Sequence, residues 1–289
     1  MKKIRKAVLP VAGFGTRVLP ATKTIPKEML PIIDRPALQY VIDEAKEAGI
    51  EHFVFVTGRN KGAIEDYFDR AYELEYSLRE KGKTDIYDQL NNDTPTPGSM
   101  SFVRQQSAKG LGHAIWCARE IIGEDPFAIL LPDVLIKSRK SCLAQMIEAY
   151  EKVGSNIIAV DSIPNEQVSK YGVISPQKRD GSIIHISGMV EKPNPASAPS
   201  NLKITGRYIL QPEIMNILEN QLAGVNDEIQ LTDAMVTLMQ NQEFYAYEYE
   251  GQDYDCGSKL GYFEAVLAYA KDHTEIGEQA QSMINRFSE

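Results

Sequence analysis

The sequence has few cysteines and no long apolar run, and each shortage excludes a class of protein. Its three cysteines, Cys117, Cys142 and Cys256, lie far apart and match no metal-ligand spacing. They indicate a reducing compartment and neither a disulfide framework nor a zinc site. No apolar run approaches the ~20 residues that span a membrane, and the apolar segment behind the basic N-terminus is too short for a signal peptide. We therefore expect a cytoplasmic protein with no membrane partner.

An excess of basic charge is also missing. The 289 residues carry a net charge of −9, which argues against nucleic-acid binding, because such binding usually needs a basic face. The chain contains neither a Gly-x-Ser-x-Gly elbow to present a nucleophile nor a Gly-Lys-Ser/Thr phosphate loop. It has no internal repeat and no low-complexity tract.

The N-terminal segment departs from this acidic background. Up to residue 27 there is no Asp or Glu, while Arg17 and Lys27 follow a strand-like run that breaks at Gly13 and Gly15. Glycines let the backbone turn tightly and approach a ligand, and the N–H groups freed by such a turn can cradle phosphate. We interpret the segment as a polyphosphate site, although a Gly-x-Gly after a strand can also be an ordinary turn. The dinucleotide fingerprint is not met, because Val18 stands where its third glycine belongs.

Strand-like and helical segments alternate through the first half of the chain, and this favours βαβ units in a parallel sheet. Strands are expected at residues 52–57, 101–105, 127–131, 156–160, 205–210 and 244–249, and helices at residues 36–49, 64–76, 141–153, 212–222, 231–239 and 260–270. After residue 161 the pattern changes, and an Asp180-Gly181 turn between two strand-like runs predicts a β-hairpin. We predict an α/β fold with a Rossmann-like mixed, mainly parallel central sheet flanked by helices and a small antiparallel subregion.

Two polar stretches leave alternatives open. Residues 79–99 form an excursion that either lies over the ligand site or is mobile, and their composition favours neither. The residues after 270 form a polar tail that either docks on a neighbour or frays.

Three polar positions follow strands where α/β sheets bind ligands. Asp133 comes directly after the apolar run 127–131, and Mg²⁺ typically takes one or two carboxylates together with phosphate oxygens. The alternative is an Asp that caps the next turn. The amide of Gln105 can read a base edge, and Gly110 belongs to a second glycine turn, although such a turn can be no more than a helix entry. His113 has no nucleophile nearby to activate, so we expect a structural role for it.

Two motifs now identify a family. The stretches Gly13-Phe14-Gly15-Thr16-Arg17 and Lys27-Glu28-Met29-Leu30-Pro31 closely resemble the signature of sugar-nucleotide pyrophosphorylases, also called sugar-1-phosphate nucleotidylyltransferases. Phe14 and Glu28 are similar to the bacterial branch that uses UTP and glucose 1-phosphate, whereas thymidylyl-type relatives more often carry Gln at the position of Glu28. The resemblance implies Mg²⁺-dependent, in-line attack of glucose 1-phosphate on the α-phosphorus of UTP. The products would be UDP-glucose and pyrophosphate.

The resemblance also implies a role for each matching residue. The catalytic residues are Arg17 and Lys27 on the triphosphate, Lys192 on the sugar phosphate and Asp133 on Mg²⁺. The further roles are Ala12, Gly13, Gly15 and Thr16 in the nucleotide loop, Glu28, Gln105 and Gly110 around uracil and its ribose, Gly172, Glu191 and Gly206 at the glucose hydroxyls, and Asp255 as a second metal ligand. Each has a plainer alternative: Glu191 and Lys192, for example, could form an ordinary surface pair, which would contribute little.

Other functions stay open on the residues alone. A nicotinamide-dependent oxidoreductase also uses a strand and a glycine turn, although Val18 and the Arg17 and Lys27 pair argue against it. A non-catalytic sugar-nucleotide sensor would keep the pocket, although the intact Asp133 and Lys192 argue against it. Within the enzyme class, thymidylyl and adenylyl transfer are the nearest competitors.

The family resemblance covers nearly the whole chain, so we expect residues 1–289 to form a single nucleotidyltransferase domain. Within it we expect a nucleotide-binding part at residues 1–160, a sugar-binding part at residues 161–257 and a C-terminal helical segment at residues 258–289. The family tends to form dimers or tetramers, which implies a homodimer or homotetramer.

Overall fold

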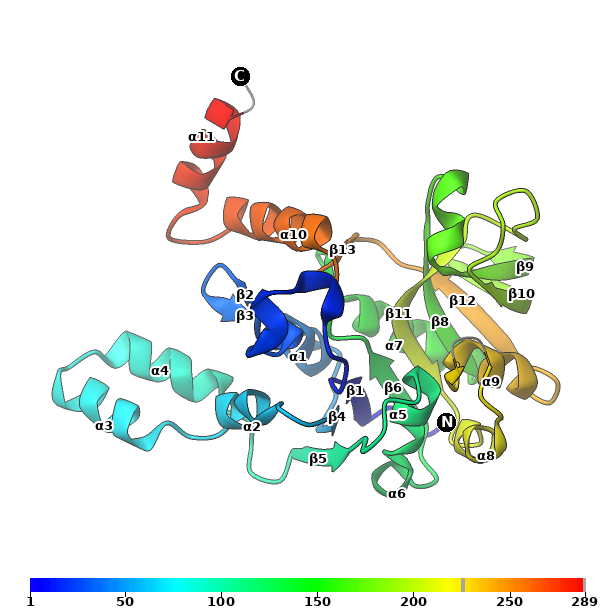
Figure 1. The fold of residues 1–289 in the computed structure, drawn as a ribbon, viewed down its shortest axis with the longest axis horizontal. Helices are drawn as coiled ribbons and strands as arrows, with labels where there is room; N and C mark the ends of the chain where they lie inside the picture. The colour runs from blue at the N-terminus through cyan, green and yellow to red at the C-terminus, as the bar shows by residue number, and fades with distance from the viewer. Residues whose placement is uncertain (225–226, 288–289) are drawn as a thin grey trace.

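A nine-stranded sheet organises the protein (Figure 1). The computed structural model describes residues 1–224 and 227–287. From one edge to the other, the strands are β5 (Met100–Arg104), β4 (His52–Thr57), β1 (Lys6–Pro10), β6 (Phe127–Leu130), β11 (Leu202–Leu210), β8 (Asn156–Ser162), β12 (Phe244–Glu248), β10 (Ile183–Glu191) and β9 (Gly172–Asp180). Two small antiparallel pairs add β2 (Pro31–Ile32) with β3 (Arg35–Pro36), and β7 (Val134–Lys137) with β13 (Gln252–Asp255).

Strand directions confirm the predicted mixed α/β sheet. The edge formed by β5, β4, β1 and β6 is parallel, and β4 and β6 are buried along almost their whole length, as unbroken apolar runs predict. β11 then enters antiparallel between β6 and β8, and β8 pairs in parallel with β12. The expected hairpin is β9 with β10, which turns after Asp180 at Gly181, where φ is +58°. The antiparallel subregion therefore belongs to the same sheet.

Helices cover both faces of this sheet. In the described chain they are α1 (Ala37–Glu47), α2 (Gly62–Phe68), α3 (Tyr72–Glu80), α4 (Thr84–Asp93), α5 (Leu111–Trp116), α6 (Arg119–Ile122), α7 (Cys142–Val153), α8 (Ile214–Asn220), α9 (Leu231–Leu238), α10 (Lys259–Lys271) and α11 (Gly277–Phe287). Short 3₁₀ helices are η1 (Thr16–Val18), η2 (Ala21–Lys23), η3 (Lys27–Met29) and η4 (Asn165–Lys170). The first three follow the glycine loop, where the prolines prevent a long helix.

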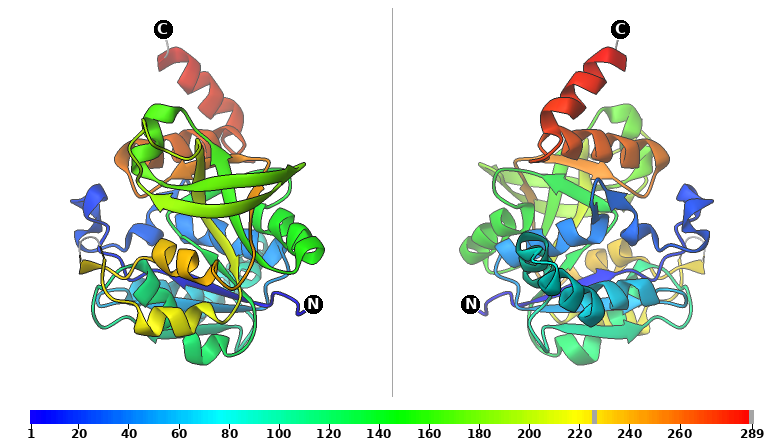
Figure 2. Two further views of the ribbon diagram at one scale, coloured as in Figure 1. Left: turned by 90° about the vertical axis from the view of Figure 1, so that its right-hand side faces the viewer. Right: turned by 90° about the vertical axis from the view of Figure 1, so that its left-hand side faces the viewer.

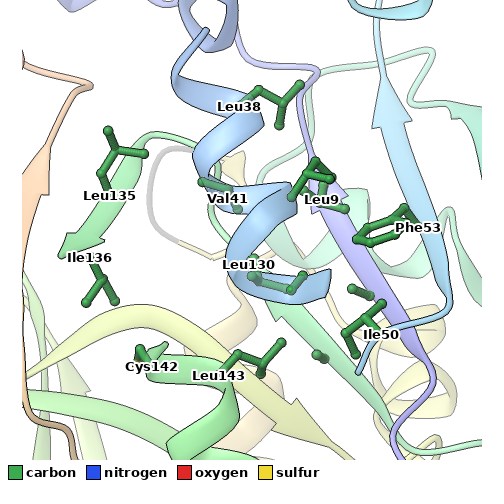
Figure 3. Close-up of a cluster of buried hydrophobic side chains, with 14 of the residues drawn as sticks. Leu9, Leu38, Val41, Ile50, Phe53, Leu130, Leu135, Ile136, Cys142 and Leu143 are labelled. Carbon is green, nitrogen blue, oxygen red and sulfur yellow. The ribbon is translucent and has the colours of Figure 1, made fainter. Parts of the chain in front are cut away.

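Alternate residues of the strands pack into two apolar layers, one on each face of the sheet, because successive side chains of a strand point to opposite faces. Leu9 of β1 lies in the layer under α1 and α7, where Figure 3 shows it beside Leu38 and Val41 of α1. Val8, its neighbour in sequence, lies in the opposite layer with α5, α8 and α9. Both faces of the central strands are therefore covered by apolar side chains. A ligand can reach the sheet only at the ends of the strands.

One predicted helix, at residues 64–76, is wrong in extent. The structure breaks it into α2 and α3, because Asp69 is extended and its carboxylate accepts from the N–H of Arg70 at 2.7 Å. Asp competes in this way with the backbone bonds of a helix. The polar stretch 79–99 is largely helical, since it completes α3 and forms α4. These two helices make a hairpin at the opposite end of the molecule from β9 and β10 (Figures 1 and 2).

The polar tail also forms a helix, α11, which projects from the body of the molecule (Figures 1 and 2). The last two residues of the expected C-terminal segment, 288 and 289, lie outside the described residues. Within residues 1–224 and 227–287, no helix combines the length and the apolar character needed to span a membrane.

Candidate active site

Two neighbouring cavities lie at the carboxyl ends of the strands. We call the first, of about 380 Å³, the glycine-loop cavity, and the second, of about 270 Å³, the hairpin cavity. They share Leu111, Leu131 and Asp133 in their walls. The expected residues in the glycine-loop cavity are Ala12, Gly13, Gly15, Thr16, Lys27, Gln105, Gly110 and Asp133. Those in the hairpin cavity are Arg17, Asp133, Gly172, Glu191, Lys192, Gly206 and Asp255.

Every expected site residue except Glu28 therefore lines one of these two cavities. A larger space of about 970 Å³ lies between α2, the α3–α4 hairpin and β5, but it contains none of them. No residue from 79 to 99 lines the glycine-loop cavity or the hairpin cavity. Of the two alternatives left open for this stretch, the structure does not show the first: the stretch does not lie over the ligand site, because it folds into a hairpin of its own beside α2.

The two sequence motifs pack directly against each other. Gly15 has a left-handed φ of +66°, and a Cβ atom there would stand 3.1 Å from Cβ of Lys27 and 3.2 Å from Cγ2 of Thr22. The hydroxyl of Thr22 also donates to the carbonyl of Gly15 at 2.8 Å. The glycine is thus required both by the backbone turn and by the closeness of Lys27.

Two cations and two carboxylates meet where the cavities join. Lys27 Nζ lies 2.5 Å from Asp133 Oδ2, while Arg17 lies 3.8 Å from Asp133 and 3.7 Å from Asp255. Burial acting alone would lower the pKa of Lys27, but the carboxylates of Asp133 and Glu28 raise it above its usual value. Burial would likewise raise the pKa of Asp133, but Lys27 and Arg17 hold it below its usual value. Both members of the pair are therefore charged.

Asp255 reaches this point through a ladder that the sequence patterns do not predict. The sequence indicates only a turn at residues 254–258, but Asp255 ends strand β13 and stands opposite Val134 of β7. The N–H of Cys256 donates to the carbonyl of Asp133 at 2.8 Å, and the N–H of Gly257 donates to Oδ1 of Asp255 at 2.9 Å. The short ladder thus ties the two carboxylates into one unit.

The donor set at this point fits Mg²⁺. A Cβ atom on Gly257 would stand 2.8 Å from Oδ2 of Asp133, 2.9 Å from Oδ1 of Asp255 and 2.6 Å from Nη2 of Arg17, so both oxygens and the guanidinium face the same small space. Among the described residues, no group of three or more His, Cys, Asp and Glu side chains could hold a metal. Mg²⁺ commonly binds one or two carboxylates and completes its shell with phosphate and water oxygens, whereas zinc and calcium take more protein ligands.

The hairpin cavity is shaped by two glycines and a strained lysine. Gly172 lies opposite Glu191 in the β9–β10 ladder, and a Cβ atom on it would stand 3.0 Å from Oε2 of Glu191. Gly206 has a φ of +71° and lies as closely against Leu131. Lys192 has a φ of +49°, which is uncommon for a residue with a side chain and often marks a functional position. Its ammonium lies 3.6 Å from Glu191 and is largely exposed.

Glu28 lies outside both cavities. It is 1% exposed, and Lys61 donates to its Oε2 at 2.8 Å. Burial raises the pKa of Glu28 above its usual value, and Lys61 opposes this rise.

Gln105 lies in the wall of the glycine-loop cavity, but its amide donates to the carbonyl of Gly110 at 3.1 Å and contacts His113 at 3.0 Å. His113 therefore contacts the same glutamine that donates to the second glycine turn, and its structural role stays a prediction.

Three residues of the walls were missed at the sequence level. Lys203 is 6% exposed in the hairpin cavity and donates to both oxygens of Asp253 at 2.8 and 2.7 Å. Thr232 donates to Glu191 at 3.1 Å, and Glu228 lines the glycine-loop cavity. The one available signal was Lys203, a charged residue at a position of strand β11 whose neighbours are apolar.

Comparisons with known proteins find similar sequences over nearly the whole chain. A family model described as nucleotidyl transferase matches residues 6–272. The UTP–glucose-1-phosphate uridylyltransferase of Bacillus subtilis (strain 168) is 48% identical over 279 residues, which cover 96% of this chain and 95% of that protein. The protein of the same name from Komagataeibacter xylinus is 50% identical over 260 residues, covering 90% and 92%.

Solved structures of similar proteins have the same fold over nearly the whole chain. A UTP-bound UGPase from Acinetobacter baumannii has a TM-score of 0.91 at 45% identity and covers 97% of this chain and 98% of that chain. A UDP-glucose pyrophosphorylase complexed with UDP-glucose has a TM-score of 0.83 at 46% identity and covers 93% and 100%.

Proposed function

Because this chain belongs to the nucleotidyl transferase family, we propose that it transfers the uridylyl group of UTP to α-D-glucose 1-phosphate, releasing pyrophosphate and UDP-glucose. One observation carries the proposal. A glycine-loop cavity and a hairpin cavity meet at Asp133, and Arg17 and Lys27 stand at the junction. Similar proteins with the same fold are described as bound to UTP and to UDP-glucose.

The reaction needs little covalent help from the protein. The attacking oxygen of a sugar phosphate is already an anion, so the task is to align two polyanions and to neutralise charge in the transition state. We assign Arg17 and Lys27 to the triphosphate and the departing pyrophosphate, and Lys192 to the attacking phosphate. The backbone of Ala12, Gly13, Gly15 and Thr16 would bind the nucleotide phosphates; these residues line the glycine-loop cavity.

Mg²⁺ is the proposed cofactor, held by Asp133 and Asp255 together with phosphate oxygens, where it would neutralise phosphate charge and orient the triphosphate. Without substrate, Lys27 neutralises Asp133 at 2.5 Å. Binding of UTP gives the ammonium of Lys27 a second anionic partner, which frees an oxygen of Asp133. We therefore propose that this chain binds Mg²⁺ well only together with UTP.

The base and the sugar take the outer parts of the two cavities. Gln105 and Gly110 are assigned to uracil and its ribose, and Gly172, Glu191 and Gly206 to the glucose hydroxyls. Glu28 is assigned to the uracil and ribose region as well. Because it is buried on Lys61, we infer that it acts by fixing the Lys27–Met29 turn, without touching the nucleotide.

We also propose how the chain is organised and where it works. Residues 1–289 act as one domain with a nucleotide-binding part (1–160), a sugar-binding part (161–257) and a C-terminal helical segment (258–289), in the cytoplasm. A homodimer or homotetramer is proposed, because apolar side chains stand exposed on α10 and α11. They are Leu260, Phe263, Met283 and Phe287, exposed by 68, 56, 52 and 83%. Leu260 and Phe263 are three residues apart on α10, and Met283 and Phe287 are four apart on α11, so each pair lies on one face of its helix. We infer that these two faces contact another copy of the chain.

The experiment that tests the proposed function is Mg²⁺-dependent release of pyrophosphate from each of UTP, dTTP, ATP, CTP and GTP, with and without glucose 1-phosphate. Release only with UTP and the sugar phosphate supports it. Release with dTTP in place of UTP would keep the mechanism and overturn the choice of nucleotide. No release with any nucleotide, together with tight binding of UDP-glucose, would indicate a sensor.

A further inference from the structure

A fully buried arginine lies directly behind the site, and no predicted role covers it. Arg207 on β11 is 0% exposed, and its partner Glu44 on α1 is 8% exposed. The guanidinium donates to both carboxylate oxygens, from Nε to Oε1 at 3.0 Å and from Nη2 to Oε2 at 2.8 Å. The pair joins the helix that follows the Lys27–Met29 turn to the strand that carries Gly206.

The remaining donors of Arg207 hold the turn that carries Asp133. They donate to the carbonyls of Val134 at 2.7 Å, Leu131 at 3.1 Å and Gly206 at 3.3 Å. A guanidinium has five N–H groups in a planar fork, and all five are used here. A lysine has three donors on one point and cannot reach this set of acceptors. Leu131 and Val134 stand on either side of Asp133, so both ends of its turn are fixed to one rigid group.

Both expected metal ligands depend on this turn. Val134 is the ladder partner of Asp255, and the carbonyl of Asp133 accepts from Cys256. A displacement of the turn therefore moves the two carboxylates together. Glu44 extends the link, because its Oε1 also accepts from the N–H of Leu143 at the start of α7, at 3.2 Å.

We propose that Arg207, oriented by Glu44, is a positioning residue that holds Asp133 and Asp255 at the spacing required for metal and triphosphate. This inference rests on the proposed function, because it assigns a task to a group behind that same site. Stability alone does not explain the arrangement, since apolar side chains of similar volume often replace a buried ion pair without loss of stability. Five directed bonds that converge on one turn fix its geometry.

The test compares the wild type with Glu44→Met/Arg207→Met, which removes both buried charges together, and with Arg207→Lys. Mn²⁺ binding to the protein–UTP complex is measured by electron paramagnetic resonance, beside kcat, KM for UTP and circular dichroism. Arg35→Met is the matched control, because Arg35 is also an ion-paired arginine, bound to Asp43 and Asp93, but it lies away from the two cavities.

We expect the folded double variant to bind Mn²⁺ about 10–100-fold more weakly, as when an outer partner of a metal ligand is lost. We expect kcat to fall about 100-fold, as for a misplacement of about 1 Å, and KM for UTP to rise, because metal and UTP are proposed to bind together. Arg207→Lys should show the same loss of Mn²⁺ affinity, and Arg35→Met should not.

A folded double variant with wild-type Mn²⁺ affinity would overturn the proposal and leave Arg207 a purely structural residue. If the double variant does not fold, Arg207→Lys decides in the same way: weakened Mn²⁺ binding supports the positioning role, and unchanged binding overturns it. A wild-type protein that neither binds Mn²⁺ with UTP nor releases pyrophosphate would instead refute the proposed function itself.

Discussion

Replacing Lys61 by methionine should make the stability of the protein fall more steeply as the pH rises. Lys61 donates to Glu28 at 2.8 Å, and the two side chains are 6% and 0% exposed. Burial already raises the pKa of Glu28 above its ordinary value of 4.5, and Lys61 is the largest opposing influence. Without Lys61 this pKa rises further, so the folded variant keeps Glu28 protonated over a wider pH range.

The size of the effect follows from the cost of protonation. Between the ordinary pKa and the raised one, the folded variant binds more protons than the unfolded chain, so its stability declines as pH rises. Each pH unit above 4.5 costs at most about 1.4 kcal/mol of the free energy of unfolding. The upper limit of the loss is therefore about 1.4 kcal/mol at pH 5.5 and about 3.4 kcal/mol at pH 7. An unpaired buried charge costs about 3–5 kcal/mol, and this cost sets the most that the stability can fall in total.

Urea unfolding followed by circular dichroism, at pH 5.5, 7.0 and 8.5, measures this directly. The double variant Lys61→Met/Glu28→Met should lose the added pH dependence, because it leaves no buried charge behind. A Lys61→Met protein that differs from the wild type by the same free energy of unfolding at pH 5.5 and 8.5 would refute the reasoning.

Three further predictions test the site and the surface. Arg17→Ala should lower kcat by about 10²–10³-fold with an unchanged circular dichroism spectrum; normal turnover of the folded variant would remove this residue from the mechanism. Gly172→Ala should raise KM for glucose 1-phosphate, because the added Cβ meets a carboxylate oxygen at 3.0 Å, whereas Gly62→Ala, with open space around it, should not; equal KM values for the two would contradict the assigned sugar position. Met283→Ser/Phe287→Ser should reduce the molar mass measured by light scattering, and an unchanged mass would place the interface elsewhere.

The sequence predicted the parts of the site that depend on local pattern. The glycine loop can be recognised because Gly13 and Gly15 interrupt a strand, and Asp133 because it ends an apolar run. Both features are set within a few residues, and the sheet then brings the strand ends to the same edge. The broad mixed α/β architecture was predicted for the same reason.

The pairings that join distant parts could not be read in this way. Glu44 and Arg207 stand 163 positions apart, and each alone resembles an ordinary charged surface residue. The β7–β13 ladder is equally non-local, and its short strands have no clear alternation of apolar and polar residues. The α3–α4 hairpin was not predicted, because its helices are mostly polar and bury few side chains. The sequence therefore shows only a weak helical periodicity of apolar residues there.

The placement of β11 limits how this enzyme can be recombined with its relatives. Residues 202–210 belong to the later half of the chain, yet they stand between β6 and β8. A chimera joined at residue 160 would therefore place a foreign strand against two native ones. Such a fusion should succeed only when the donor supplies side chains that match both flanking strands, so β11 is the natural unit to exchange together with the nucleotide-binding half.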